Sequence, residues 1–533
     1  MEVDCIPFRD TGYFSDLICD YLDEHIALKS FYNRFPNLEN FEGQIAEKIQ
    51  NFDHGHRNVL VEVLQHQYSS TNTSKKTAAN IRSLKEQNTF TVVTGHQLNL
   101  FTGPIYFLYK IISTINLTKQ LKKKYPEHEF VPVFWMATED HDFDEINYFN
   151  RNGKKIQWNK QALGAVGRLD TEGLDEVFQV ISAEFGNIEN GKRLSALFEK
   201  AYLGHKTLAE ATRYLANELF GTHGLVILDA DEAKLKRLLI PFMKEDVFEK
   251  IPYKEVSKSI DDLSSVAETY PIQVNPREIN YFYLKDGLRE RIIEKDGKFY
   301  VNDTEFEFSK HELEKEMDAH PERFSPNVIA RPLYQEVILP NLCYIGGGGE
   351  LAYWLELKSY FSALDVTFPM LLLRNSALVM TKKQAEKVKK LDLTISDLFC
   401  EQNQLINKKI RKISNIDIDF APQKKHLEEQ FEALYELAEQ TDKSFLGAVK
   451  AQEVKQKKGL DKLEKRLLKA QKRKLKDHVT RLTALQNELF PNQSLQERQL
   501  NFSALYLEYG EDLISNLINA LAPLKNEFLI LRH

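Results

Sequence analysis

Two short apolar runs joined by one amphipathic helix constrain the fold of this chain most strongly. Residues 90–93 and 131–137 predict strands that end in the polar sequences TGHQ and TEDHD. The segment between them predicts a helix that Thr102 or Gly103 caps, with Pro104 in its first turn. A strand, a helical crossover and a second strand form a right-handed parallel unit in nearly all known proteins. Both polar turns are therefore expected at the ligand-binding edge of one sheet.

Further apolar runs extend this sheet. Residues 224–229, 342–345 and 368–374 predict buried strands, which brings the expected sheet to five or more strands. The Asn-Gly pair at 152–153 predicts a β-hairpin, and the short aromatic runs between 270 and 305 predict an antiparallel meander. The fold class is therefore α/β, with a parallel-sheet core and small inserted modules.

The composition changes along the chain and indicates its domains. We expect a core at 1–380, with connecting modules inserted at about 150–220 and 250–320. Long helices with heptad-like apolar spacing predict a coiled-coil domain at 381–494, and the segment 495–533 is expected to pack back on the core. The predicted coil is an antiparallel helical hairpin whose exposed apolar seam needs a partner. Its basic stretch is either a solvated face or an anion- or nucleotide-binding face.

Charge and cysteine content exclude several classes of protein. The net charge of -7 gives no overall attraction to nucleic acid, so no nucleic-acid partner is expected. The start MEVDCIPF does not resemble a signal peptide, and no apolar run reaches the length of a membrane span. A cytoplasmic location without a membrane partner is the resulting expectation. The four cysteines lack metal-site or paired spacing, so neither a disulfide framework nor a structural zinc site is expected.

The first polar turn offers groups that recognise anions. His96, Gln97 and Asn99 supply an imidazole and two carboxamides, and Thr102 and Gly103 stand before the helix. Small residues beside a helix N-terminus suit a phosphate or a carboxylate. The turn matches neither a dinucleotide-binding fingerprint nor a phosphate-binding P-loop, so an ordinary capping turn is the alternative.

The second polar turn concentrates charge. Glu139, Asp140 and Asp142 place three carboxylates around His141. Mutual repulsion is expected to raise the pKa of at least one carboxylate, and the imidazole can share a proton. Ligation of a hard cation and a solvated acidic loop are the alternatives.

A glycine run at 346–349 forms the third candidate. Glu350 follows it where a P-loop has lysine, and this carboxylate would repel a phosphate but suit an ammonium or sugar hydroxyls. Arg331 and Gln335 precede the run on a predicted short helix. Arg331 is expected either to bind a carboxylate of a substrate or to form an ion pair within the chain.

Four stretches together resemble one known family, the cysteine-adding enzymes of bacillithiol biosynthesis. They are TGHQLNLFTGPIYFLYKIIS, VPVFWMATEDHDFDEIN, SPNVIARPLYQEVILPNLCYIGGGGELAYWL and the long C-terminal helices, in the same order. The resemblance implies a Rossmann-like core and a C-terminal coiled coil through which two subunits pair as a homodimer. It also implies a ligase that adds cysteine to the amine of glucosaminyl malate in the last step of bacillithiol biosynthesis.

The resemblance also assigns site residues. Its catalytic candidates are Glu139, Asp140, His141 and Asp142. Its binding candidates for substrate or nucleotide are His96, Gln97, Asn99, Thr102, Gly103, Asn327, Arg331, Gln335, Gly347 and Glu350. The family often has glutamine at the place of His96, so His141 is the preferred acid or base.

Amide formation from a free carboxylate needs activation, so we expect ATP as the driving nucleotide, with ADP as the related ligand and Mg²⁺ as a candidate cation. The TGHQ and TGP turns are the expected phosphate site. Two other classes remain open at this stage. One is a metal-dependent hydrolase that uses the acidic turn at 139–142, and the other is a non-catalytic coiled-coil accessory protein.

Overall fold

The computed structural model describes residues 2–151, 153–441 and 443–532 of the 533-residue chain. The chain divides into two compact units. The first is formed by Met1–Val379 together with Leu495–His533, and the second by Met380–Ser494. Each unit has a hydrophobic interior of its own.

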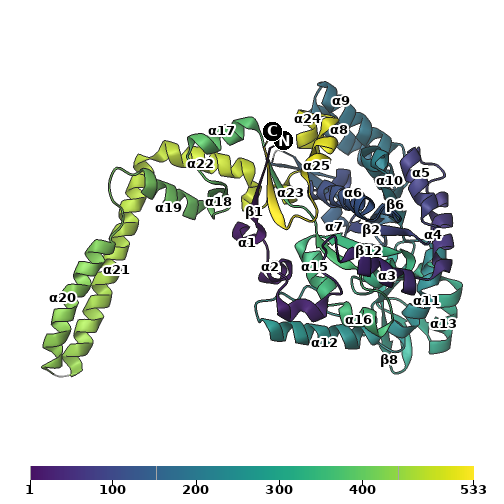
Figure 1. The fold of residues 1–533 in the computed structure, drawn as a ribbon, viewed down its shortest axis with the longest axis horizontal. Helices are drawn as coiled ribbons and strands as arrows, with labels where there is room; N and C mark the ends of the chain where they lie inside the picture. Colours follow the sequence, from purple (N-terminus) through teal and green to yellow (C-terminus); the bar gives the residue numbers. More distant parts are fainter. Residues whose placement is uncertain (1, 152, 442, 533) are drawn as a thin grey trace. The chain divides into compact units, whose positions relative to one another are not determined.

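The core of the first unit is a five-stranded sheet in the order β13-β12-β2-β3-β6 (Figure 1). Every pairing between its neighbouring strands is parallel. The strands are β2 (Thr89–His96), β3 (Glu129–Met136), β6 (Val226–Asp229), β12 (Asn341–Gly346) and β13 (Met370–Leu373). The predicted α/β class and the predicted parallel strands are confirmed.

The strand order reverses beside β2. The chain runs from β2 to β3 and β6 on one side, and β12 and β13 then occupy the other side of β2. Because crossovers between parallel strands are right-handed, the connections on the two sides of this reversal cover opposite faces of the sheet. The carboxyl ends of β2 and β12 therefore flank a crevice of the kind that binds ligands in open α/β sheets.

Helix α6 (Tyr106–Lys124) crosses from β2 to β3 and packs against both strands. Its N-cap residue is Ile105, and no side chain of the described residues caps it. In the turn before it Thr102 has a φ of 69°, and the Asn501 side-chain amide donates to the Gly103 carbonyl at 2.6 Å. The predicted cap at Thr102 or Gly103 is therefore wrong, because Asn501 holds this turn in a non-helical conformation.

The N-terminal region is mainly helical. It contains α1 (Phe8–Thr11), α2 (Asp16–Leu22), α3 (Phe41–Asn51), α4 (His54–Gln67) and α5 (Lys75–Ser83). The chain between β3 and β6 contains α7 (Phe143–Ile146), β4 (Tyr148–Arg151), β5 (Lys154–Gln157), α8 (Leu174–Phe185), α9 (Glu189–Phe198) and α10 (Leu208–Phe220). Strands β4 and β5 form the predicted hairpin, in which Asn152 lies outside the described residues and Gly153 has a φ of 76°.

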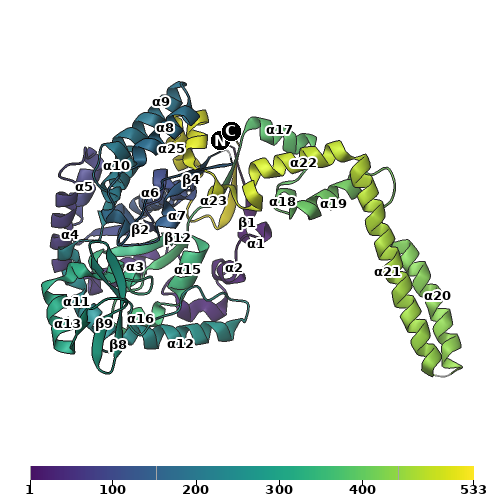
Figure 2. The ribbon, with the colours of Figure 1, turned by 180° about the vertical axis from the view of Figure 1, so that it is seen from behind.

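The chain between β6 and β12 forms a second, mostly antiparallel sheet in the order β10-β9-β8-β7-β11. This segment of the chain contains, in order, α11 (Ala233–Val247), α12 (Ile251–Val266), β7 (Tyr281–Lys285), β8 (Leu288–Lys295), β9 (Lys298–Val301), β10 (Glu307–Phe308), α13 (Lys310–Ala319), β11 (Phe324–Pro326) and α14 (Ala330–Ile338). Figure 2 shows β8 and β9 beside α13. The predicted meander is confirmed.

The glycine run is shorter as a loop than expected. Gly347 is the N-cap residue of α15 (Gly348–Leu355), so the last two glycines of the predicted loop 346–349 lie in the first helical turn. Because glycine has no side chain, the backbone can turn sharply here, and Gly347 alone connects β12 to α15. Helix α15 is followed by a separate short helix, α16 (Lys358–Ala363).

The two ends of the chain meet in a three-stranded sheet in the order β1-β15-β14. Its strands are β1 (Glu2–Pro7), β14 (Ala377–Met380) and β15 (Glu527–Arg532). The sequence left residues 528–531 open between a strand and a helix end, and they form a strand. Strand β1 was not predicted, because Ile6 is its only buried residue and the sequence shows no alternation. The helices before β15 are α23 (Gln496–Gln499), α24 (Phe502–Tyr509) and α25 (Asp512–Ala520).

The second unit is helical. It contains α17 (Lys382–Lys390), α18 (Ile395–Leu398), α19 (Gln402–Ile413), α20 (Ala421–Glu439), α21 (Lys443–Lys474) and α22 (Lys476–Leu489). Helices α20 and α21 lie side by side as a long hairpin (Figures 1 and 2), which confirms the predicted coiled coil. Phe431, Ala438 and Val449 pack inside it, whereas Leu434 and Leu463 are 39% and 53% exposed. No helix among the described residues has the length and apolar character needed to cross a membrane.

A buried ion pair fastens the C-terminal segment to the sheet and gives a test of the fold. The Glu497 carboxylate accepts from the Arg374 guanidinium at 2.7 Å and from the Ala377 N–H at 3.0 Å. Glu497→Ala leaves a buried guanidinium without its anion, so we expect the free energy of unfolding to fall by about 3–5 kcal/mol in chemical denaturation.

The matched control is Glu307→Ala, which removes the exposed ion pair with Lys298. We expect this change to cost less than about 1 kcal/mol. Equal losses in the two variants would show that the buried pair does not hold the segment in place.

Candidate active site

A pocket of about 540 Å³ opens at the carboxyl ends of four strands of the parallel sheet. Gly95 to Gln97 come from the end of β2, residues 135–140 from the end of β3, residues 347–350 from the turn after β12, and Arg374 from the residue after β13. The reversal of strand order beside β2 therefore creates the crevice in which the pocket lies. Residues of the second sheet and of the C-terminal segment form its outer wall.

The structure brings most of the sequence-predicted site residues together in this pocket. Those that line it are His96, Gln97, Glu139, Asp140, Asn327, Arg331, Gly347 and Glu350. Those outside its lining are Asn99, Thr102, Gly103, His141, Asp142 and Gln335. Gln335 is fully buried behind Arg331 and accepts from its guanidinium at 3.2 Å. Asn99 donates to the Glu145 carbonyl at 3.2 Å, and Asn501 covers the turn at Gly103.

Glu350 contacts three other groups at the inner wall of the pocket. Its carboxylate lies 2.6 Å from the buried Lys110 ammonium and accepts from the Gly347 N–H at 2.8 Å and the Tyr344 hydroxyl at 2.7 Å. Burial opposes ionisation of this carboxyl group, yet Lys110 and these hydrogen bonds outweigh burial and lower the pKa of Glu350 to about 2. Glu350 is therefore a permanent anion. It already holds the Gly347 N–H that a P-loop would offer to a phosphate.

His96 is buried in a neutral form. Burial and the nearby Lys110 ammonium lower the pKa of His96 to about 3. Its Nδ1 lies 2.7 Å from the Gln97 carbonyl, which can only accept, so Nδ1 carries the proton and Nε2 is the acceptor. Nε2 has no hydrogen-bond partner among the described residues. His96 therefore carries no charge, and its unpartnered Nε2 is buried.

Arg331 presents an unpaired guanidinium to the pocket. It donates to Gln335 at 3.2 Å, and its guanidinium carbon lies 5.7 Å from the ring centroids of both Trp135 and Tyr344. No carboxylate of the described residues forms an ion pair with it, so the intrachain pair that the sequence left open is not formed. A guanidinium flanked by aromatic faces and lacking an anion suits a carboxylate or a phosphate.

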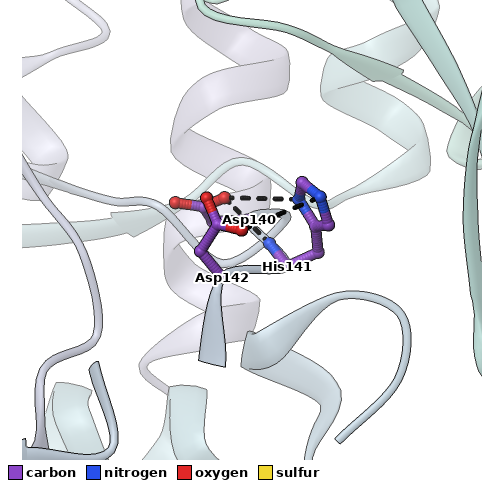
Figure 3. Close-up of side chains that lie close together, drawn as sticks. All are labelled: Asp140, His141 and Asp142. Atoms are coloured by element: carbon purple, nitrogen blue, oxygen red, sulfur yellow. Dashed lines mark hydrogen bonds and ion pairs between the residues drawn. The ribbon is translucent and has the colours of Figure 1, made fainter. Parts of the chain in front are cut away.

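The acidic turn is divided between the pocket and the surface. Figure 3 shows the Asp140 and Asp142 carboxylates facing the His141 ring, with oxygen-to-nitrogen distances of 3.7 and 3.9 Å. Asp140 lines the pocket, whereas His141 and Asp142 are exposed. The Arg289 guanidinium donates to His141 Nδ1 at 2.8 Å, so this nitrogen is deprotonated and its lone pair is engaged.

These three side chains are the one group of potential metal ligands among the described residues. An imidazole whose Nδ1 is bound by a guanidinium leaves only Nε2 for an ion, and the guanidinium charge repels a cation. The arrangement therefore does not fit a metal site, and no metal-dependent step follows from it.

A chain of hydrogen bonds behind the pocket positions Asn327 and the start of α14. The buried Asp246 carboxyl group accepts from the Asn280 N–H at 2.9 Å, and the Asn280 side-chain oxygen accepts from the Asn327 amide at 3.1 Å. The Asn327 side-chain oxygen in turn accepts from the Ile329 N–H at 2.8 Å. This bond fixes the turn just before α14, the helix that carries Arg331.

Several residues of the pocket were missed from the sequence. They are Lys110, Gln273, Arg289, Arg374 and Arg498. Lys110 had a visible signal, since it is a lone charge in the apolar helix segment IYFLYKIIS. The other four residues gave no such signal, because only the tertiary fold brings their segments to the edge of the sheet. With them the lining carries five cationic side chains against the three carboxylates of Glu139, Asp140 and Glu350, so the pocket favours an anion.

The fold and the pocket define a Rossmann-like α/β protein with a small-molecule site at the switch point of its sheet. A family model described as "Bacillithiol biosynthesis BshC, N-terminal Rossmann-like domain" matches residues 1–375, and one described as "Bacillithiol biosynthesis BshC, C-terminal coiled-coil domain" matches residues 377–533. The chain therefore belongs to the BshC family of bacillithiol biosynthesis.

Curated relatives are similar over their whole length. A protein of Christiangramia forsetii is 61% identical over 535 residues, covering 100% of this chain and 99% of the relative. A protein of Flavobacterium johnsoniae is 60% identical and covers 100% of both chains, and one of Bacillus mycoides is 27% identical and covers 94% and 95%. All three carry the name "Putative cysteine ligase BshC".

The buried Asp246 gives a pH test of this architecture. Burial raises the pKa of Asp246 from 3.8 to about 7, so the folded state holds a proton that the unfolded chain releases. The contribution of this group to stability is therefore fully present below about pH 4 and is lost as pH rises to about 7. Asp246→Asn removes this loss, and we expect it to raise the free energy of unfolding at pH 8 by up to about 4 kcal/mol.

Chemical denaturation at pH 8 and pH 4.5 measures this difference, which should nearly vanish at the lower pH. Asp262→Asn, at an exposed position of α12, is the control and should change stability little at either pH. A gain from Asp246→Asn that is the same at both pH values would contradict a protonated Asp246.

Proposed function

We propose that this protein is a ligase that adds cysteine to the amine of glucosaminyl malate and so completes bacillithiol. The full-length likeness to relatives named as cysteine ligases, together with a pocket that combines cationic and acidic walls, carries this proposal. The product contains a new amide bond between the cysteine carboxyl carbon and the glucosamine nitrogen.

The charges of the pocket support a definite placement of the sugar substrate. Malate carries two carboxylates, which match the unpaired Arg331 guanidinium and the neighbouring Arg374 and Arg498. The amine of the glucosamine matches the acidic side at Glu139 and Asp140. Under this proposal the amine lies where a carboxylate can accept the proton that it loses on forming the amide.

The activation of cysteine is part of the proposal. A free carboxylate does not form an amide in water without activation, and ATP would supply this activation as an acyl phosphate, with release of ADP, or as an acyl adenylate, with release of pyrophosphate and then AMP. The phosphates of ATP would share Arg374 and Arg498 with the malate carboxylates, because Lys110 is already paired with Glu350. The glycine turn offers fewer free backbone N–H groups to a phosphate than the sequence indicated, because the Glu350 carboxylate already accepts from the Gly347 N–H. Mg²⁺ would accompany the phosphates rather than bind the turn at 140–142.

We also propose that two subunits pair through the helical hairpin of the second unit. Leu434 and Leu463 expose apolar side chains on α20 and α21, as an unpaired seam would. A cytoplasmic location remains a prediction from the sequence. The hydrolase and the accessory protein are not favoured, since neither matches the names of the relatives.

A direct assay tests the reaction. Purified protein is incubated with glucosaminyl malate, cysteine and ATP, and mass spectrometry should detect the cysteinyl amide. Absence of the amide under every nucleotide and metal condition would overturn the ligase proposal.

A variant tests the anion wall. Arg331→Met removes the guanidinium, and we expect KM for glucosaminyl malate to rise about 10- to 100-fold because a charge-assisted hydrogen bond is lost. The control is Arg193→Met, which removes an exposed arginine that is paired with Glu189 and does not line the pocket. An unchanged KM in Arg331→Met would remove Arg331 from substrate binding while leaving the ligase reaction itself in place.

A further inference from the structure

A buried lysine lies behind Glu139, on the side away from the pocket. The Lys236 ammonium is 2.5 Å from the Glu139 carboxylate and 2.9 Å from the Asp231 carboxylate, and it donates to the Glu322 carbonyl at 3.2 Å. The Lys236 side chain is 0% exposed, whereas that of Glu139 is 12% exposed and lines the pocket. One face of the Glu139 carboxyl group is therefore held by a cation and the other faces the ligand space.

The three acceptors fix the ammonium in one position. An ammonium has three hydrogens, and Glu139, Asp231 and the Glu322 carbonyl surround it from three different parts of the chain. Asp231 is itself fixed, because the Arg168 guanidinium donates to its two oxygens at 2.7 and 3.0 Å. The sequence showed none of these contacts, since Lys236 lies on α11 and looks like an ordinary helical lysine.

The charge balance at Glu139 depends on this lysine. Burial raises the pKa of Glu139, the Lys236 ammonium lowers it, and the Asp231 carboxylate raises it again. The other charged or titratable groups that act on Glu139 are Arg289 of β8, Arg168, Tyr281 of β7 and Tyr334 of α14, with Asp140 adjacent in the chain. Among these groups in the described part of the chain, Lys236 is the cation that forms an ion pair with Glu139.

We propose that Lys236 is a positioning residue that holds Glu139 ionised and directed into the pocket as the general base of the ligase reaction. This inference rests on the proposed function. His141 is less suited to this role, because it lies outside the pocket lining and Arg289 engages its Nδ1. In the reaction the amine nitrogen forms its bond to the activated acyl carbon, and Glu139 takes the proton from that nitrogen. The acyl group is activated beforehand, when the cysteine carboxylate displaces ADP or pyrophosphate from ATP. On amide formation the bond from the acyl carbon to the phosphate oxygen breaks, and phosphate, or AMP from an adenylate, leaves with the electron pair.

The pH profile of kcat/KM for glucosaminyl malate tests this role in the full-length protein. In the wild type the acidic limb reports protonation of Glu139. Lys236→Met removes the cation that opposes the effect of burial most strongly, so the acidic limb of the profile moves to higher pH by about one unit or more, while Lys236→Arg keeps a cation and restores the limb toward the wild type. Lys234→Met, two residues away in an exposed pair with Glu62, is the matched control and leaves the profile unchanged.

An unchanged limb in Lys236→Met, or an equal shift in Lys234→Met, would overturn the inference. Infrared difference spectroscopy of the wild type against Glu139→Gln adds a readout that needs neither activity nor a folded Lys236→Met variant. A carboxylate band for Glu139 at pH 7 is expected, and a protonated carboxyl band would overturn the inference. A wild type that shows the carboxylate band but forms no amide would instead contradict the proposed ligase function.

Discussion

The ion pair between the buried Lys110 and the half-buried Glu350 joins the two halves of the candidate pocket. Lys110 belongs to α6, which follows β2, and its ammonium also donates to the Gly95 carbonyl at the end of β2 at 2.7 Å. Glu350 belongs to α15, which follows β12. Because the Lys110 ammonium is buried and would be costly without an anion, its pairing with the half-buried Glu350 carboxylate fixes the ends of the two strands on either side of the strand-order reversal.

The same pair explains why the glycine turn differs from a phosphate-binding loop. A P-loop leaves its backbone N–H groups open for phosphates, whereas here Glu350 accepts from the Gly347 N–H and is neutralised by Lys110. Positive charge for a ligand then comes from side chains on other elements, chiefly Arg331. The lining of the pocket consequently carries both cationic and acidic side chains. A substrate that carries both carboxylates and an amine meets complementary charges at its two ends.

The sequence predicted the sheet well because the order of its strands follows from general rules. Apolar runs at 90–93, 131–137 and 342–345 were identifiable, and right-handed crossovers place their ends together. The polar turns after these strands were therefore expected at one edge, and His96, Glu139 and Glu350 do line one pocket.

Residues that reach the pocket through tertiary contacts could not be predicted in this way. Arg289 lies on a strand of the inserted meander, and Arg498 follows the helical second unit by a few residues. Nothing in their local sequence indicates which of many surface arginines approaches the sheet edge. Helix boundaries failed for a similar reason, since the side chain of Asn501, about 400 residues away, decides the conformation of the turn at Gly103.

The orientation of glucosaminyl malate in the pocket tests the central claim most directly. A crystal structure of the protein with this compound bound, and with cysteine and nucleotide omitted, would locate both ends of the ligand. The account predicts that the malate carboxylates contact Arg331 and that the amine nitrogen lies within hydrogen-bond distance of Glu139. A ligand bound in the opposite direction, or bound outside this pocket, would contradict it.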